Sequence, residues 1–134
     1  MIRPERELSM PQIQGDLQAQ IMTALWRLES GTVEQVRSGL PPRYRGAYTT
    51  VQTVLNRLAE RGLLVRTKRG NAIVYTPKLT EAEYVSRSIE RTLAGASTHA
   101  REAAIARLIG DLDPDEITAL RRRARELERK RKKQ

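Results

Sequence analysis

Apolar residues recur every three or four positions in three stretches of the N-terminal half of the chain, residues 16–28, 33–40 and 48–61. This spacing predicts three amphipathic helices, because it places the apolar side chains on one face of each helix. Thr32, with Gln35 three positions later, forms a capping box that predicts the start of the second helix. The first half of the chain is therefore expected to build a small helical core.

The pattern changes after the third predicted helix. Two short runs rich in β-forming residues, 63–68 and 73–76, flank the pair Gly70-Asn71. This pair supplies the positive φ that a tight turn needs, so the two runs predict a β-hairpin. Three short helices followed by a basic hairpin is the order of a winged helix-turn-helix. The third helix would then be the DNA-reading element and the hairpin the wing.

Three more helices are predicted in the second half, starting near residues 80, 98 and 113, and the first and last of them are opened by a capping residue, Thr80 and Asp113. Their apolar residues have no evident partner inside so small a domain, so we assign them to dimerisation. The residues assigned to this contact are Ile89, Leu93, Ile105, Leu108, Ile109, Ile117, Leu120 and Leu127.

The expected fold class is mainly α, with a small β component (α+β). We divide the chain into a flexible N-terminal arm (1–14), a winged-helix DNA-binding domain (15–78), a helical dimerisation domain (79–127) and a basic C-terminal tail (128–134).

Composition excludes several kinds of chemistry. The 134 residues include no cysteine and a single histidine, so neither a disulfide nor a metal site of several imidazoles can form. No arrangement of nucleophile, base and metal ligands points to an enzyme, and no cofactor or metal is expected. The chain has no apolar run long enough for membrane insertion, so we expect a cytoplasmic protein.

The net charge of +9 is concentrated in two blocks. Residues 43–78 hold eight Lys and Arg against Glu60 alone, and residues 121–134 hold nine against Glu126 and Glu128. Such blocks indicate phosphate-facing surfaces. The second block has two interpretations: the solvated end of the last helix, or a source of non-specific DNA affinity.

The third helix is expected to expose a short, polar and mostly uncharged face. Side chains of this kind can approach base edges in a major groove. The predicted base-reading residues on and beside this face are Thr49, Gln52, Thr53 and Asn56. The predicted phosphate contacts are Arg43, Arg45, Tyr48, Arg57, Lys68 and Arg69, although Tyr48 has packing beneath the helix start as an alternative.

Several segments together resemble the penicillinase-repressor (BlaI/MecI-type) family over roughly residues 15–85. They are the first helix around Ile21-Met22 and Leu25-Trp26, the run 47–58, the turn Arg61-Gly62-Leu63-Leu64 and the wing segment Val74-Tyr75-Thr76-Pro77. The resemblance implies a winged helix that reads inverted-repeat operators, a dimer formed by C-terminal helices, and a membrane-bound sensor protease that relieves repression. It also adds Thr50 to the expected DNA contacts. The chain has no Phe, so the Asn–Phe bond that is cleaved in the best-known members is absent.

The sequence thus predicts a sequence-specific repressor that acts as a homodimer on double-stranded operator DNA. Two alternatives stay open: a non-specific, architectural nucleic-acid-binding protein driven by net charge, and a winged helix used as a protein-interaction adaptor. The first would bind any duplex with similar affinity, and the second would bind none at physiological salt.

Overall fold

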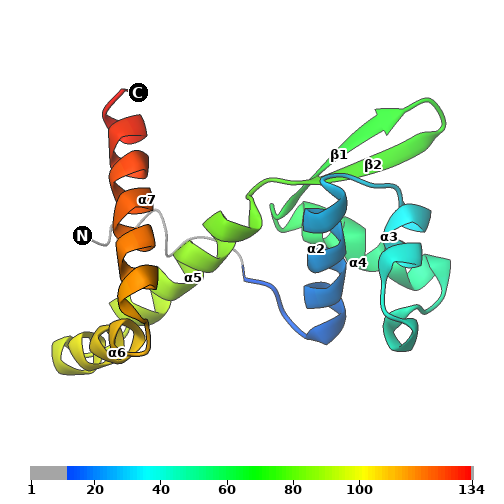
Figure 1. Ribbon diagram of the computed structural model, residues 1–134. Helices are drawn as coiled ribbons and strands as arrows, with labels where there is room; N and C mark the ends of the chain where they lie inside the picture. Colours follow the sequence, from blue (N-terminus) through cyan, green and yellow to red (C-terminus); the bar gives the residue numbers. More distant parts are fainter. Residues whose placement is uncertain (1–11, 134) are drawn as a thin grey trace. The chain divides into compact units, whose positions relative to one another are not determined.

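A computed structural model describes residues 12–133, which form two compact units that divide within one helix, after Arg91. The first unit contains α2 (Asp16–Leu28), α3 (Val33–Gly39), the 3-10 helix η1 (Pro42–Tyr44), α4 (Tyr48–Glu60), β1 (Leu64–Arg69), β2 (Ala72–Pro77) and most of α5 (Glu81–Ala94) (Figure 1). The second contains the end of α5, α6 (Thr98–Gly110) and α7 (Pro114–Lys132). The predicted order of helices and hairpin is confirmed, and η1 is an element that the hydrophobic pattern did not predict.

The first unit has one hydrophobic core, built where α2, α3 and α4 meet the base of the hairpin. Its fully buried side chains come from all of these elements: Ile21, Met22, Ala24, Leu25, Val33, Val36, Leu40, Val51, Leu55, Leu58, Leu63, Leu64 and Tyr75. Among the described residues, no polar or charged residue other than Tyr75 is buried with them. The apolar faces predicted from helical spacing therefore point inward as expected.

Local interactions explain where α3 begins and where α4 ends. Thr32 Oγ1 accepts a hydrogen bond from the backbone N–H of Gln35 and the Gln35 side chain accepts one from the Thr32 N–H, which completes the predicted capping box. Gly62, directly after the α4 C-cap, has φ +87°, a conformation that side chains with a Cβ rarely adopt. The chain therefore leaves α4 sharply and enters β1.

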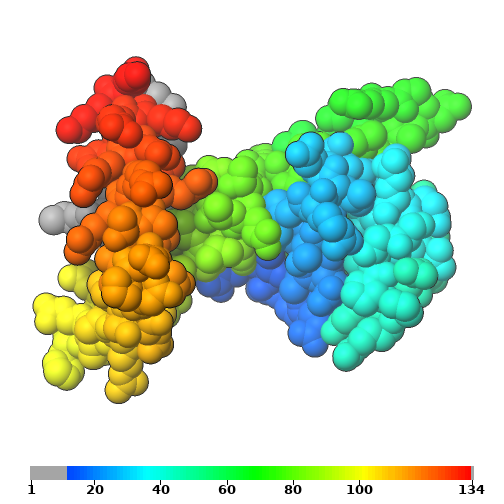
Figure 2. All heavy atoms as spheres, in the orientation of Figure 1, coloured from blue at the N-terminus to red at the C-terminus, as the bar shows by residue number. Residues whose placement is uncertain are grey.

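The hairpin pairs β1 with β2 in antiparallel register, from Leu64 opposite Pro77 to Arg69 opposite Ala72. The predicted two-residue turn is present, but only Gly70 has positive φ (+60°) and Asn71 does not. Gly70 therefore supplies the positive φ of the pair, because a two-residue turn of this kind needs it only at the first central residue. The turn end of the hairpin projects beyond the helices of this unit (Figures 1 and 2).

The end of the first unit lies later in the chain than the predicted boundary at residues 78 and 79. The Trp26 ring stacks at a tilt against Tyr84 of α5, with ring centroids 5.6 Å apart, and Trp26 Nε1 donates to the Leu79 carbonyl. Tyr84 Oη also accepts a hydrogen bond from the Ile13 N–H. The first turn of α5 is therefore part of the winged-helix unit. The predicted N-terminal arm lies outside the described residues, apart from 12–14.

The second unit has no buried residue in α6 or α7. Its capping follows the prediction: Asp113 accepts from the Glu116 N–H, and Pro114 occupies the first helical position. α7 continues as a helix through the predicted boundary at residues 127 and 128, so residues 128–132 of the predicted tail are helical. Within residues 12–133, no helix is both long and apolar enough to cross a membrane.

Candidate nucleic-acid interface

The loop between α3 and α4 is held by two arginines that donate to backbone carbonyls. Arg37 Nε donates to Gly46 O at 2.7 Å, and Arg45 Nη2 donates to Leu40 O at 2.9 Å and Ser38 O at 3.3 Å. Arg45 was predicted as a phosphate contact; the structure places its guanidinium beside the C-terminal end of α3. These three hydrogen bonds fix the path of the loop and hence the position at which α4 begins.

The N-terminus of α4 lies open. Its N-cap residue is Ala47, whose side chain cannot cap the helix, and no side-chain hydrogen bond replaces it. The free N–H groups and the positive end of the helix dipole make such a terminus favourable for a phosphate group. Tyr48, the first residue of α4, is 48% exposed, so packing in the core is wrong for this side chain.

The exposed face of α4 carries three of the predicted base-reading residues, Thr49, Thr50 and Thr53, with Gln52 half-buried beside them. Thr53 Oγ1 donates to the Thr49 carbonyl at 2.8 Å, which satisfies its hydroxyl hydrogen within the helix. None of these side chains is large or charged, so the face keeps the shape needed for approach to a groove.

Asn56, the remaining predicted base reader, is already bonded within the protein. Its Oδ1 accepts from Tyr75 Oη at 2.7 Å and from Arg66 Nη1 at 3.2 Å, so it links α4 to both strands of the hairpin. A side-chain amide needs both its oxygen and its nitrogen to bind adenine bidentately. In this structure the oxygen is shared by two protein donors, so Asn56 positions the wing against α4.

Tyr75 is the central residue of this link, and sequence reasoning did not find its hydrogen bond. The side chain is 1% exposed, and its backbone pairs with Gly31 through two hydrogen bonds of 2.8 and 3.0 Å. Burial raises the pKa of the Tyr75 hydroxyl above its usual value, opposed by the nearby Arg66 charge. Asn56 and Tyr75 lie on different elements with different periodicities, so no sequence pattern connects them.

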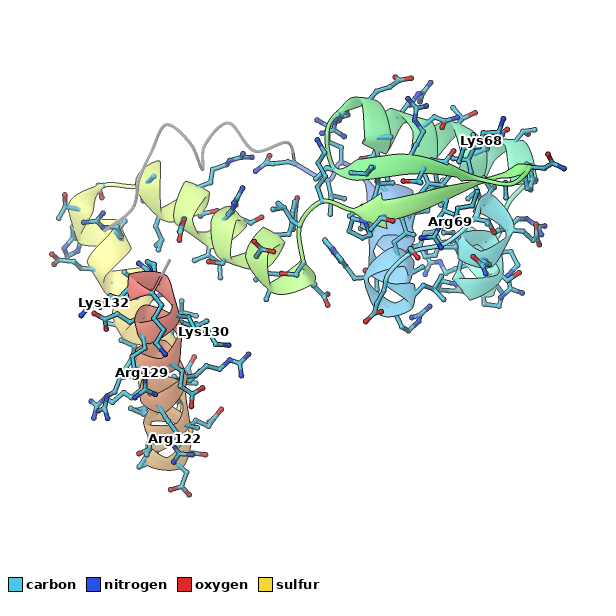
Figure 3. All side chains as sticks on the ribbon, turned by 90° about the horizontal axis from the view of Figure 1, so that it is seen from above. Lys68, Arg69, Arg122, Arg129, Lys130 and Lys132 are labelled. Carbon is cyan, nitrogen blue, oxygen red and sulfur yellow. The ribbon has the colours of Figure 1, made fainter. Side chains whose placement is uncertain are left out.

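Four of the cations predicted to contact phosphate are exposed in the winged-helix unit and are not neutralised by the described residues. Lys68 and Arg69 are exposed at the end of β1, next to the turn of the wing (Figure 3). Arg57 is exposed on α4, and the Arg43 guanidinium lies 4.9 Å from the centre of the Tyr44 ring. Among residues 12–133, none of these four cations forms an ion pair within 4.0 Å. All remain available to an external polyanion.

These features, a polar helix face beside an open helix end and a basic wing, belong to a DNA-binding winged helix. The profile of the family described as "Penicillinase repressor" matches residues 14–126. The chain belongs to this family. The repressor is 40% identical to the transcriptional regulator BlaI of Mycobacterium tuberculosis over 116 residues, 85% of this chain and 84% of that protein.

Other relatives match a shorter part of the repressor. The penicillinase repressor of Bacillus licheniformis is 33% identical over 76 residues, 57% of this chain and 59% of that protein. The solution structure of the Bacillus licheniformis BlaI monomer in complex with the blaP half-operator is 32% identical, covers 56% of this chain and 90% of that one, and has a TM-score of 0.47.

The family assignment confirms the predicted function class. This chain is a DNA-binding transcriptional repressor, and its role is not enzymatic. In the part of the chain that the structure describes, no three acidic or histidine side chains come together in a way that could hold a metal ion.

Proposed function

We propose that this repressor acts as a homodimer, with the α4 helices of two protomers in successive major grooves of an inverted-repeat operator. The observation that carries the proposal is the exposed face of α4, which presents short polar side chains on a helix with an uncapped start, in the same unit as the exposed cations of the wing. Half-sites about one helical turn apart, roughly 34 Å, are then expected. Bound there, the dimer would block polymerase.

Within this interface we assign base reading to Thr49, Thr50, Gln52 and Thr53. Gln52 is the one side chain of this set with both a donor and an acceptor on a planar amide, as bidentate recognition of adenine requires. Arg43, Arg57, Lys68 and Arg69 are assigned to phosphates, which set register and affinity and not sequence preference.

The dimer is supported by apolar side chains that the second half of the chain leaves in water. Ile89, Leu108, Ile109, Leu120 and Leu127 are each between 47% and 60% exposed. Apolar surface of this extent is costly in water and marks an interaction site. Along α7, Ile117, Leu120 and Leu127 recur at spacings of three and seven, which is typical of a helix–helix seam.

The proposal includes relief of repression by a sensor protease, because the family resemblance implies this step. Because the chain contains no Phe, a cleaving protease would have to cut a bond other than Asn–Phe. Mass spectrometry of the repressor from induced and uninduced cells tests this step, because cleavage would give two fragments whose masses identify the bond.

Selection of bound duplexes from a random pool at about 0.15 M salt tests the central claim. Enrichment of an inverted repeat supports the dimeric, sequence-specific repressor. Equal retention of all duplexes would favour the architectural alternative, and no retention would favour the protein-interaction adaptor.

Two substitutions then separate base reading from phosphate binding. Gln52→Ala should weaken binding to the selected operator by about 1–3 kcal/mol and leave binding to a scrambled duplex unchanged. Arg57→Gln, the contrasting variant on the same helix, should weaken both duplexes alike. Equal losses on both duplexes for Gln52→Ala would remove its base-reading role.

Sedimentation measurements test the dimer. Leu120→Ser together with Leu127→Ser should convert the protein to a monomer, because each substitution removes an apolar side chain from the seam. Ile73→Ser provides the matched control, since Ile73 is 44% exposed on the wing and lies outside the proposed contact. A double variant that sediments as a dimer would contradict the assignment of α7.

A further inference from the structure

The basic block at the end of the chain is ordered as one face of α7. Advancing 100° per residue along the helix brings four cations to one side: Arg122, Arg125, Arg129 and Lys132. We call these four residues the basic stripe; Figure 3 shows three of them on α7. The apolar seam of Ile117, Leu120 and Leu127 lies on the other side of the helix. A partner that covers the seam would therefore leave the basic stripe in water.

The described residues neutralise only part of the stripe. Lys132 Nζ lies 3.8 Å from Glu128, but within residues 12–133 Arg122, Arg125 and Arg129 make no ion pair within 4.0 Å. This holds although Glu126 stands four positions after Arg122 and three before Arg129. Like charges three or four positions apart on a helix repel each other. The stripe therefore favours an external anion.

Helix-end electrostatics explains only part of this arrangement. Cations in the last turn stabilise a helix by interacting with its negative end, and Arg129 and Lys132 lie in the last turn of α7. The effect fades beyond that turn, so it accounts for neither Arg122 nor Arg125. These two arginines extend the stripe toward the middle of the helix.

A DNA duplex matches the stripe better than an anionic membrane does. From Arg122 to Lys132 the helix rises about 15 Å, and duplex DNA presents one negative charge per roughly 1.7 Å of its axis. Arginine also binds phosphate in a two-pronged geometry. A membrane-surface helix needs bulky apolar or aromatic side chains to insert, and residues 124–133 contain only Ala124 and Leu127 as apolar residues.

We propose that the basic stripe of α7 is a second DNA-binding surface, which contacts the phosphate backbone of duplex DNA without sequence preference. The proposal rests on the DNA-binding function of the repressor and adds a contact outside the winged helix. It requires neither a particular operator nor a particular inducer.

The test compares two triple variants of the full-length protein with equal net charge. In the stripe variant, Arg122, Arg125 and Arg129 become Gln; in the matched control, Arg123, Lys130 and Arg131, which lie off the stripe, become Gln. Glutamine is close to arginine and lysine in helix propensity, so α7 should remain folded, and circular dichroism checks this. Affinity for a scrambled duplex is measured across a range of salt concentrations.

The stripe variant should lower the slope of log affinity against log salt by about 0.9 for each phosphate that it no longer binds, and the control variant should lower it less. An unchanged slope in the stripe variant would overturn the proposal, as would equal decreases in both variants, which would indicate net charge and not a surface. A third outcome would assign the stripe to membranes. In that case the wild-type protein would sediment with phosphatidylserine vesicles and the stripe variant would not, while the salt dependence of duplex binding would be the same in both proteins. Failure of wild-type protein to bind any duplex would instead refute the proposed function itself.

Discussion

Truncation of Asn56 should destabilise the repressor more than removal of the Tyr75 hydroxyl, although the two groups share one hydrogen bond. The bond joins Tyr75 Oη to Asn56 Oδ1 over 2.7 Å, and Tyr75 is 1% exposed. Tyr75→Phe removes the donor and keeps the buried ring, so it should cost about 1 kcal/mol, the net value of one hydrogen bond. Asn56→Ala leaves a buried hydroxyl without its acceptor, which should raise the cost to about 2–3 kcal/mol.

The double variant Asn56→Ala with Tyr75→Phe measures the coupling between the two side chains. It leaves no buried hydroxyl, so its destabilisation should be smaller than the sum of the two single effects by about 1–2 kcal/mol, within the range of coupling seen for residues in contact. Urea unfolding of the full-length protein, followed by circular dichroism, measures all three values. Protein concentration must be fixed, because the stability of a dimer depends on it.

Tyr48→Phe is the matched control, because it removes a tyrosine hydroxyl that is exposed at the start of α4. It should change the free energy of unfolding by less than about 0.5 kcal/mol. Additive single effects, or an Asn56→Ala cost no larger than that of Tyr75→Phe, would show that the hydroxyl is not held by Asn56 and would refute the positioning role.

Three further predictions follow from the same unit. The double variant Lys68→Gln with Arg69→Gln should bind operator and scrambled duplexes more weakly by the same factor, because exposed cations near the wing turn bind phosphates. It should also lower the slope of log affinity against log salt concentration. A binding titration in which only operator affinity falls would contradict this prediction. The raised pKa of Tyr75 means that the folded state retains its proton longer than the unfolded state, so stability should fall as pH rises above about 10 toward the folded-state pKa. Unfolding experiments across that range should show a smaller decline in Tyr75→Phe, and equal declines would count against burial as the cause. Gly62→Ala should cost about 1–2 kcal/mol because φ is +87° there, whereas Gly46→Ala, with negative φ and equally open space, should cost far less in thermal unfolding.

The order and limits of the secondary structure could be predicted almost entirely from the sequence, because they depend on near neighbours. The predicted first helix, 16–28, agrees with α2 residue for residue. The capping boxes begun by Thr32, Thr80 and Asp113 open α3, α5 and α7 where they were expected. Helical spacing, side-chain caps and a glycine turn all act within about four positions, so the sequence displays them directly.

The candidate site was predicted less completely, because part of it depends on contacts between distant segments. Helical spacing correctly placed Thr49 and Thr53 on the exposed face of α4, but it could not show that Asn56 is bonded to Tyr75, nineteen positions away. Helical spacing carries no information about which side chain of a neighbouring element lies opposite a given position.

The sequence by itself determined the elements, their capping, the inward faces of the winged helix and the location of its charge. Only the tertiary structure decided that Asn56 and Arg45 hold the framework, and that Tyr84, packed on Trp26, joins α5 to the first unit. The reason is physical: a polar side chain at a surface position has several acceptable partners, and the choice among them is made by whichever element packs beside it.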